Sequence, residues 1–400
     1  MKVKHYQDSV GVQYARGNAQ ENSNKFVLLL TILAYAFPVL SLMDDDANSS
    51  SSVSIYTAPS LAALLFLSLY SFVKISGKER LFFIFTLISG FLIAAATAYR
   101  MPFVDPDKVT SYFIVFISFG CILFLTLCLR EVQRNLDLVL LATGAFGLLL
   151  LVLNPTEYDA GRLTYGASNP IWMGRALGVG ALAAVAVAVN RPFLRLPAIG
   201  LFLVLSLSVL LTGSRGPFMA IFAGVAVTFG VKRFSNKYWI TSVFVYIIIV
   251  ASIIIIGFFP DYFRALSFGN LNDQSFDYRS SMIQYSIDII LSSKDGIGIG
   301  QFYFMGFTYP HNVILESFVE WGWVYGALYS TFIIAGVVCC VLLEKEIFLF
   351  PMLAVFEFLN AIVSGDMTSP RLLYGLCLYG WLLLLGFVLK SRAPKKAGLP

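Results

Sequence analysis

Two apolar runs joined by a short basic turn decide the fold of this chain. Residues 170–190 read PIWMGRALGVGALAAVAVAVN, residues 191–195 read RPFLR, and residues 196–213 read LPAIGLFLVLSLSVLLTG. Each run is close to the ~20 residues that a helix needs to cross about 30 Å of hydrocarbon. Lipid offers the backbone no hydrogen-bond partner, so such runs must be helical. The stretch therefore predicts two membrane-spanning helices.

The same pattern extends over most of the chain. Of its 400 residues, 58% are hydrophobic and only 13% are charged, whereas soluble domains carry about 25% charged residues. A water-soluble core cannot hide this much apolar side chain, so the surrounding solvent must be lipid. The chain is expected to be an all-α polytopic integral membrane protein with about twelve transmembrane helices, near residues 26–43, 55–73, 81–99, 109–129, 136–153, 170–189, 196–213, 217–231, 238–259, 322–343, 347–364 and 371–389.

The distribution of lysine and arginine predicts the orientation of these spans. If the N-terminus is cytoplasmic, most of the 28 basic residues lie in short inside loops, as the positive-inside rule requires. The first polar residues then form a cytoplasmic leader, which does not resemble a cleaved signal peptide. The chain divides into the leader (1–25), transmembrane helices one to nine (26–259), an outer loop (260–310), an outer helix with the last three spans (311–389) and a cytoplasmic tail (390–400).

The long outer connection from Pro260 to about Pro310 is the part of the chain most suited to a function of its own, because loops of this length are usually functional. Residues 278–291 carry apolar residues at helical spacing, which predicts an amphipathic helix along the outer membrane surface. Residues 296–300 read GIGIG and predict a tight irregular turn. This stretch is not a nucleotide-binding fingerprint, since no strand precedes it.

Two arginines are candidate ligands for a phosphate. Arg215 lies between Ser214 and Gly216, where one span ends at the outer face and the next begins. Its guanidinium matches phosphate oxygens, and backbone N–H groups at a helix start favour an anion. The alternative is an arginine that reaches to lipid head groups. Arg279, in the outer loop, is either a second cation for the same anion or an interfacial anchor paired with Asp277.

His311 is the candidate for proton transfer. It precedes Asn312, where the long loop meets a helix that carries Glu316 and Glu320. A neutral imidazole there can take a proton from a sugar hydroxyl, and the alternative is a helix-capping histidine. Arg175 lies about one turn into a helix and needs a partner or a wet cavity; a structural role is its alternative.

Neither a metal nor a nucleic acid is expected. His311 is the only histidine besides His5 in the leader, so it cannot build a histidine cluster, and the five cysteines all fall inside apolar segments without CxxC spacing. The basic residues form no patch suited to nucleic acid. No cofactor is therefore predicted.

The order of these motifs resembles the O-antigen ligase and O-antigen polymerase superfamily of bacterial envelope glycosyltransferases. The resemblance spans roughly residues 160–345. The pieces are Ser214-Arg215-Gly216, Asp277-Tyr278-Arg279, Gly296 to Gly300, and His311-Asn312 followed by Leu315-Glu316, Glu320 and Gly322.

The resemblance implies a fold like that of GT-C glycosyltransferases and a reaction at the periplasmic face of the inner membrane. The donor would be a glycan on undecaprenyl pyrophosphate, and the acceptor either the lipid A core or another lipid-linked glycan. Arg215 and Arg279 would bind the pyrophosphate and His311 would activate the acceptor hydroxyl, with Ser214, Gly216, Arg175, Asn312 and Glu316 as further substrate-binding candidates. No metal or ATP is implied. Membrane lipids are the other expected partners, joined by a chain-length regulator protein if the enzyme is a polymerase.

Spacing favours ligase over polymerase. Polymerases of this type are described with Arg-x10-Gly motifs in two large outer loops. Here the spacing from Arg215 to Gly224 is x8, Arg279 has no glycine at the required spacing, and the segment 154–169 is too short for a second large loop. A flippase of lipid-linked sugars is the rival from another class. It should show polar residues deep in several helices, whereas here they gather on the outer side. A structural scaffold would leave the arginines and the histidine unexplained.

Overall fold

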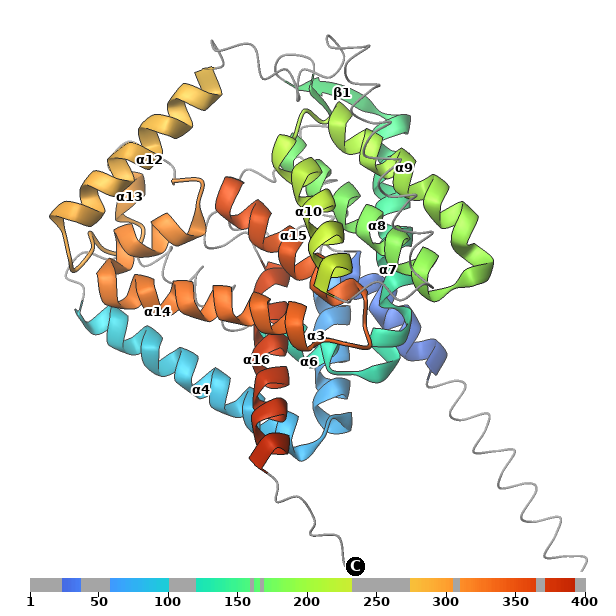
Figure 1. Ribbon diagram of the computed structural model, residues 1–400, viewed down its shortest axis with the longest axis horizontal. Coiled ribbons are helices and arrows are strands. Elements are labelled where there is room, and N and C mark those ends of the chain that lie inside the picture. The colour runs from blue at the N-terminus through green and yellow to red at the C-terminus, as the bar shows by residue number, and fades with distance from the viewer. Residues whose placement is uncertain are drawn as a thin grey trace, which may run out of the picture.

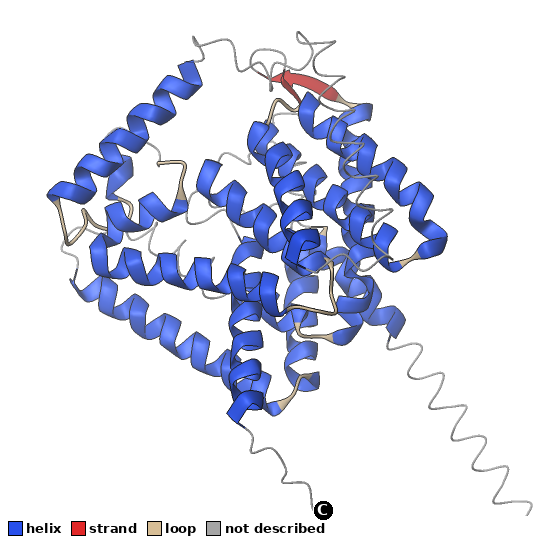
Figure 2. Ribbon diagram, in the orientation of Figure 1, coloured by secondary structure: helices blue, strands red, loops and turns tan. Residues whose placement is uncertain are grey.

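The structure is a computed structural model that describes residues 24–36, 58–100, 120–158, 162–165, 169–231, 274–304, 310–364 and 371–392. Within these ranges it is dominated by helices (Figures 1 and 2). After an apolar helix at Asn24–Tyr35, they are α3 (Ala58–Lys74), α4 (Gly77–Arg100), α6 (Gly120–Leu127), α7 (Arg130–Leu153), α8 (Pro170–Asn190), the 3-10 turn η3 (Pro192–Leu194), α9 (Arg195–Leu211), α10 (Arg215–Val231), α12 (Gln274–Ser292), α13 (Gln301–Phe304), α14 (Val313–Leu343), α15 (Leu349–Ser364) and α16 (Arg371–Arg392).

Five of the described helical segments are long and apolar enough to cross a membrane. They are Arg130–Leu153, Pro170–Asn190, Pro192–Leu211, Val313–Leu343 and Arg371–Leu389. Shorter apolar helices occupy Asn24–Tyr35, Ala58–Lys74, Arg215–Val231 and Leu349–Val363. The predicted number of twelve spans is therefore not established, and the segment expected at 238–259 lies outside the described residues.

Helix α8 is the centre of the bundle. It contacts α7, α9, α10 and α15, and 83% of the residues in its most apolar stretch are buried. Small residues allow this close packing: a Cβ on Gly144 of α7 would lie 2.5 Å from the Cα of Gly180 in α8. Since lipid does not drive apolar helices together, such small residues are what let membrane helices pack tightly.

The short outer connection between α7 and α8 contains two strands, which the prediction of an all-α fold did not include. Strands β1 (Pro155–Tyr158) and β2 (Arg162–Tyr165) form an antiparallel hairpin in which Pro155 pairs with Tyr165. The pairing satisfies backbone groups that have left the two helices. Arg162, expected in a short outer loop, begins β2, and the hairpin lies at the top of the molecule in Figure 1.

Helix α7 begins at Arg130, six residues before the predicted apolar span at 136–153. The helix includes the polar residues that precede the apolar run, because a helix can extend beyond the hydrocarbon. Helix α14 begins at Val313, as expected for the outer helix after His311, and its kink at Gly322 coincides with the predicted start of the span. Helix α12 covers the expected amphipathic segment 278–291.

Candidate functional site

The turn that carries Ser214 and Arg215 is fixed against the start of α8. Gly213, with φ of 66°, follows the end of α9 and turns the chain toward α10, which begins at Arg215. The buried Ser214 Oγ donates a 3.0 Å hydrogen bond to the carbonyl oxygen of Pro170. A Cβ on Gly174 would lie 3.0 Å from the Cβ of Ser214. Arg215 therefore stands, half-buried, on a turn whose position is set by α8.

Arg175 joins α8 to α15. Its guanidinium is buried, donates a 3.0 Å hydrogen bond from Nη2 to the carbonyl oxygen of Asn360, and lies 5.1 Å from the centre of the Trp172 ring. The carboxylate of Glu357, one turn before Asn360, interacts electrostatically with Arg175. This is the kind of partner that a buried charge requires. A role of Arg175 in binding substrate stays a prediction.

The glycine-rich segment is an irregular turn, as predicted. Gly296, Gly298 and Gly300 have φ of 79°, 105° and 77°, values that side chains other than hydrogen disfavour. The segment docks on the kink of α14: the Ile297 N–H donates to the carbonyl oxygen of Val319 at 2.9 Å, and the Gly298 N–H to that of Glu320 at 3.1 Å. The outer-loop segment thus lies against α14.

His311 and Asn312 form the entrance to α14. His311 is half-buried and has φ of 56°, in the left-handed region that histidine adopts more often than most residues. The Asn312 side-chain oxygen accepts hydrogen bonds from the N–H groups of Ile314 and Leu315 at 2.9 and 3.1 Å. Asn312 is therefore the N-cap of α14, and only its amide nitrogen can donate to a substrate. Glu316 and Glu320 are each only 2% exposed.

The three residues predicted to act lie on or next to elements that contact α14. Helix α12, which carries the half-buried Arg279, packs on α14 through a small core of Met282, Ile289, Phe302 and Val319. Helix α10, which begins with Arg215, also contacts α14. His311 directly precedes α14. The three residues are thus carried by elements that share one neighbour (Figure 1).

Part of the chain matches a known protein family. Residues 200–330 match the O-antigen ligase family. The match supports membership of the O-antigen ligase superfamily, so the resemblance predicted from the motifs is confirmed. It also supports a glycosyltransferase-like activity in a multi-pass membrane protein. No curated protein matches the chain.

The segment that matches the O-antigen ligase family contains most of the candidate residues. Ser214, Arg215, Gly216, Arg279 and the residues from His311 to Glu316 all lie within 200–330. Arg175 lies outside the match and directly follows Gly174, which packs against the turn at Ser214.

Sequence reasoning missed two residues beside Arg175. The first is Trp172, which the sequence analysis does not single out. An aromatic residue three positions before an arginine on a helix lies on the same face. Asn360 acts through its backbone carbonyl, which no side-chain pattern reveals. Within the described residues, no group of three histidine, cysteine or acidic side chains could hold a metal ion.

Proposed function

We propose that this protein is an O-antigen ligase. It transfers an O-antigen glycan from undecaprenyl pyrophosphate to a sugar of the lipid A core oligosaccharide. The site faces the periplasm from the bacterial inner membrane, and both termini are cytoplasmic. The observation that carries the proposal is that α14 contacts the elements bearing Arg215 and Arg279 and begins next to His311, all within the segment that matches the family.

The chemistry needs only residues of this chain. The bond between the anomeric carbon of the donor sugar and the pyrophosphate oxygen breaks, and a bond from the acceptor hydroxyl oxygen to that carbon forms. Arg215 and Arg279 stabilise the negative charge that develops on the departing undecaprenyl pyrophosphate. His311 orients the acceptor hydroxyl and takes its proton. An in-line attack of this kind inverts the anomeric centre.

The fold around α8 favours a ligase over a polymerase. The second large outer loop expected of a polymerase would lie between α7 and α8, where the structure has strands of only four residues each. The glycine spacing after Arg215 also differs from the polymerase pattern.

A deletion strain distinguishes the candidate reactions. A ligase deletion yields lipid A core without O-antigen and accumulates long lipid-linked polymer. Core that carries a single repeat unit identifies a polymerase instead, and unchanged lipopolysaccharide points to another glycan or to a flippase. Retention of the donor's anomeric configuration in the product contradicts the in-line step.

Single substitutions test the assigned roles. Arg215→Ala, Arg279→Ala and His311→Ala are each expected to lower transfer by about 100-fold or more, the usual cost of losing a charge-stabilising donor or a general base. Lys78→Ala, an exposed side chain at the start of α4, is the matched control and should retain full transfer. Normal expression with normal transfer in all three variants would show that the site lies elsewhere.

A further inference from the structure

A second polar site lies at the far end of α8 from Ser214. Helix α8 has 21 residues, and at 1.5 Å per residue it separates Pro170 from Arg191 by about 30 Å. A pocket of about 410 Å³ opens there, within the size range of small-molecule sites. It is lined by Arg130, Gln133, Arg134, Asp137, Asn190, Arg191, Glu346, Ile347 and Leu349.

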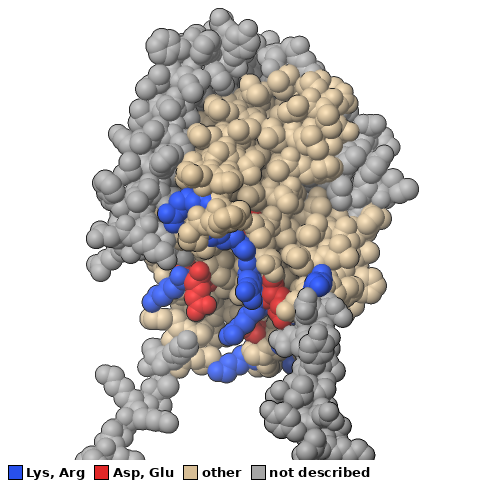
Figure 3. Space-filling model, turned by 90° about the vertical axis from the view of Figure 1, so that its right-hand side faces the viewer, with Lys and Arg blue, Asp and Glu red and all other residues tan. Residues whose placement is uncertain are grey.

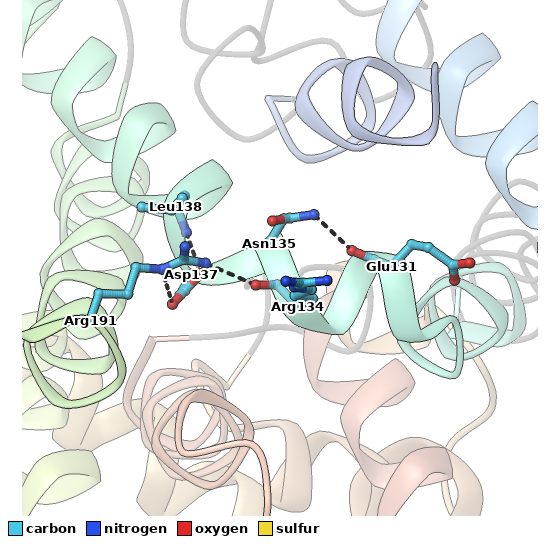
Figure 4. A network of polar contacts seen from close by, with 6 residues as sticks. All are labelled: Glu131, Arg134, Asn135, Asp137, Leu138 and Arg191. Atoms are coloured by element: carbon cyan, nitrogen blue, oxygen red, sulfur yellow. Dashed lines mark hydrogen bonds and ion pairs between the residues drawn. The ribbon is translucent and has the colours of Figure 1, made fainter. Parts of the chain in front are cut away.

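One arginine of the pocket is fixed by an ion pair. Arg191 donates from Nε to Asp137 Oδ2 at 3.2 Å and from Nη2 to Oδ1 at 2.9 Å, and Nη2 also donates to the carbonyl oxygen of Arg134 at 2.9 Å (Figure 4). The buried Asp137 carboxylate also accepts the N–H of Leu138 at 2.8 Å. The hydrogen bonds of the Asp137 carboxylate are therefore made to Arg191 and to the backbone of α7.

The other two arginines remain available. Arg130 and Arg134 are exposed and one helical turn apart, so they share a face of α7. Within the described part of the chain, neither guanidinium makes a hydrogen bond or ion pair. In Figure 4 the carboxylate of Glu131 points away from Arg134. Two guanidinium groups thus line the pocket without a paired anion among the described residues; besides Asp137, the exposed Glu346 is the other carboxylate among the lining residues.

The wall opposite α7 is also fixed. The buried Glu344 carboxylate accepts the N–H groups of Glu346 and Ile347 at 2.7 and 2.8 Å, and its other oxygen accepts the hydroxyl of Tyr379 at 2.6 Å. This holds the turn between α14 and α15, so the pocket is formed before any ligand arrives. The N-termini of α7 and α15 meet here and add to the attraction for an anion.

Exposed apolar side chains close to Arg191 in the sequence indicate a lipid. Phe193 and Leu196, which follow Arg191, are 95% and 75% exposed. On the face that shows the right-hand side of Figure 1, charged side chains gather low on the molecule below a broad area without them (Figure 3). We propose that this pocket binds the phosphate of an anionic lipid headgroup, with Arg130 and Arg134 as ligands and the acyl chains beside Phe193.

Thermal stability of the full-length protein in a zwitterionic detergent tests the proposal. Phosphatidylglycerol at about 100 times its Kd should raise the Tm by roughly 3 °C, and phosphatidylcholine should not. The double variant Arg130→Gln/Arg134→Gln should lose this shift and keep the wild-type Tm without lipid, because both side chains are exposed. Lys78→Gln, another exposed cation, should keep the shift.

Three outcomes overturn the assignment. An equal shift with the zwitterionic phosphatidylcholine removes the specificity for an anionic headgroup, and a shift that persists in the double variant shows that these two arginines are not the ligands. A shift of the same size with inorganic phosphate alone assigns the pocket to a soluble anion in place of a lipid. None of these measurements involves glycan transfer, so lipid binding at the pocket is tested independently of the proposed function.

Discussion

The Trp323 N–H donates a 2.9 Å hydrogen bond to the carbonyl oxygen of Lys294, outside its own helix. In an uninterrupted helix it would donate to Val319, four residues earlier. The kink at Gly322 breaks that bond, and the Val319 oxygen instead accepts the N–H of Ile297 at 2.9 Å. The outer-loop segment thus satisfies both groups that the kink releases, which explains how a glycine-rich turn is held against α14.

Gly322→Ala should disrupt this junction. Gly322 has φ of 75°, and a Cβ there would lie 2.5 Å from the carbonyl oxygen of Lys294. We expect a loss of about 2–3 kcal/mol in stability together with loss of transfer, measured by thermal unfolding and by glycan transfer in the same preparation. Gly200→Ala in α9, where a Cβ meets nothing within 4 Å, should be neutral or slightly stabilising. Equal Tm and equal transfer in the two variants would contradict the role of Gly322 at this junction.

Ser214→Ala should uncouple the Arg215 turn from α8. The substitution removes the 3.0 Å hydrogen bond to Pro170 and should lower the free energy of unfolding by about 1 kcal/mol. Because Arg215 follows directly, glycan transfer should fall by more than this loss of stability explains. The control is Ser206→Ala in α9, whose buried hydroxyl has no hydrogen-bond partner among the described residues. That variant should keep its Tm and activity; a larger loss there than at Ser214 contradicts the role of the bond.

Arg175 and Glu357 should depend on each other. Arg175→Met leaves the buried Glu357 carboxylate without its opposite charge, which should destabilise the protein by about 3 kcal/mol or more. Adding Glu357→Gln should recover part of the loss, because the uncompensated charge is then gone. The Tm of the wild type, the two single variants and the double variant gives the coupling. Strictly additive losses would mean that the two charges do not interact.

Two substitutions of Asn312 distinguish its role as a helix cap from a role in substrate binding. Asn312→Asp keeps a side-chain oxygen for the N–H groups of Ile314 and Leu315 and should preserve the Tm, while Asn312→Ala should cost about 1 kcal/mol. If the amide nitrogen also binds substrate, the Asp variant unfolds normally but transfers more slowly. Full activity in the Asp variant would leave Asn312 as a cap alone, and a large fall in its Tm would contradict the cap.

Sequence alone predicted many of the helices and proposed the candidate residues of the site. Long apolar runs admit only helix in lipid, so α8, α9 and α16 lie close to their predicted ranges. The motif order predicted the superfamily that the match over residues 200–330 supports. The positive φ values at Gly296, Gly298 and Gly300 follow from glycine content, which is likewise a local property.

Tertiary structure decided what no local pattern encodes. The hairpin between α7 and α8 depends on pairing between two strands too short to show a period. The partner of Arg175 is the backbone carbonyl of Asn360, 185 positions further along the chain, and a carbonyl belongs to every residue type. The kink at Gly322 could be placed only once Lys294 and Ile297 were found against it, because a glycine in a helical run breaks the helix only where other backbone groups take over its hydrogen bonds.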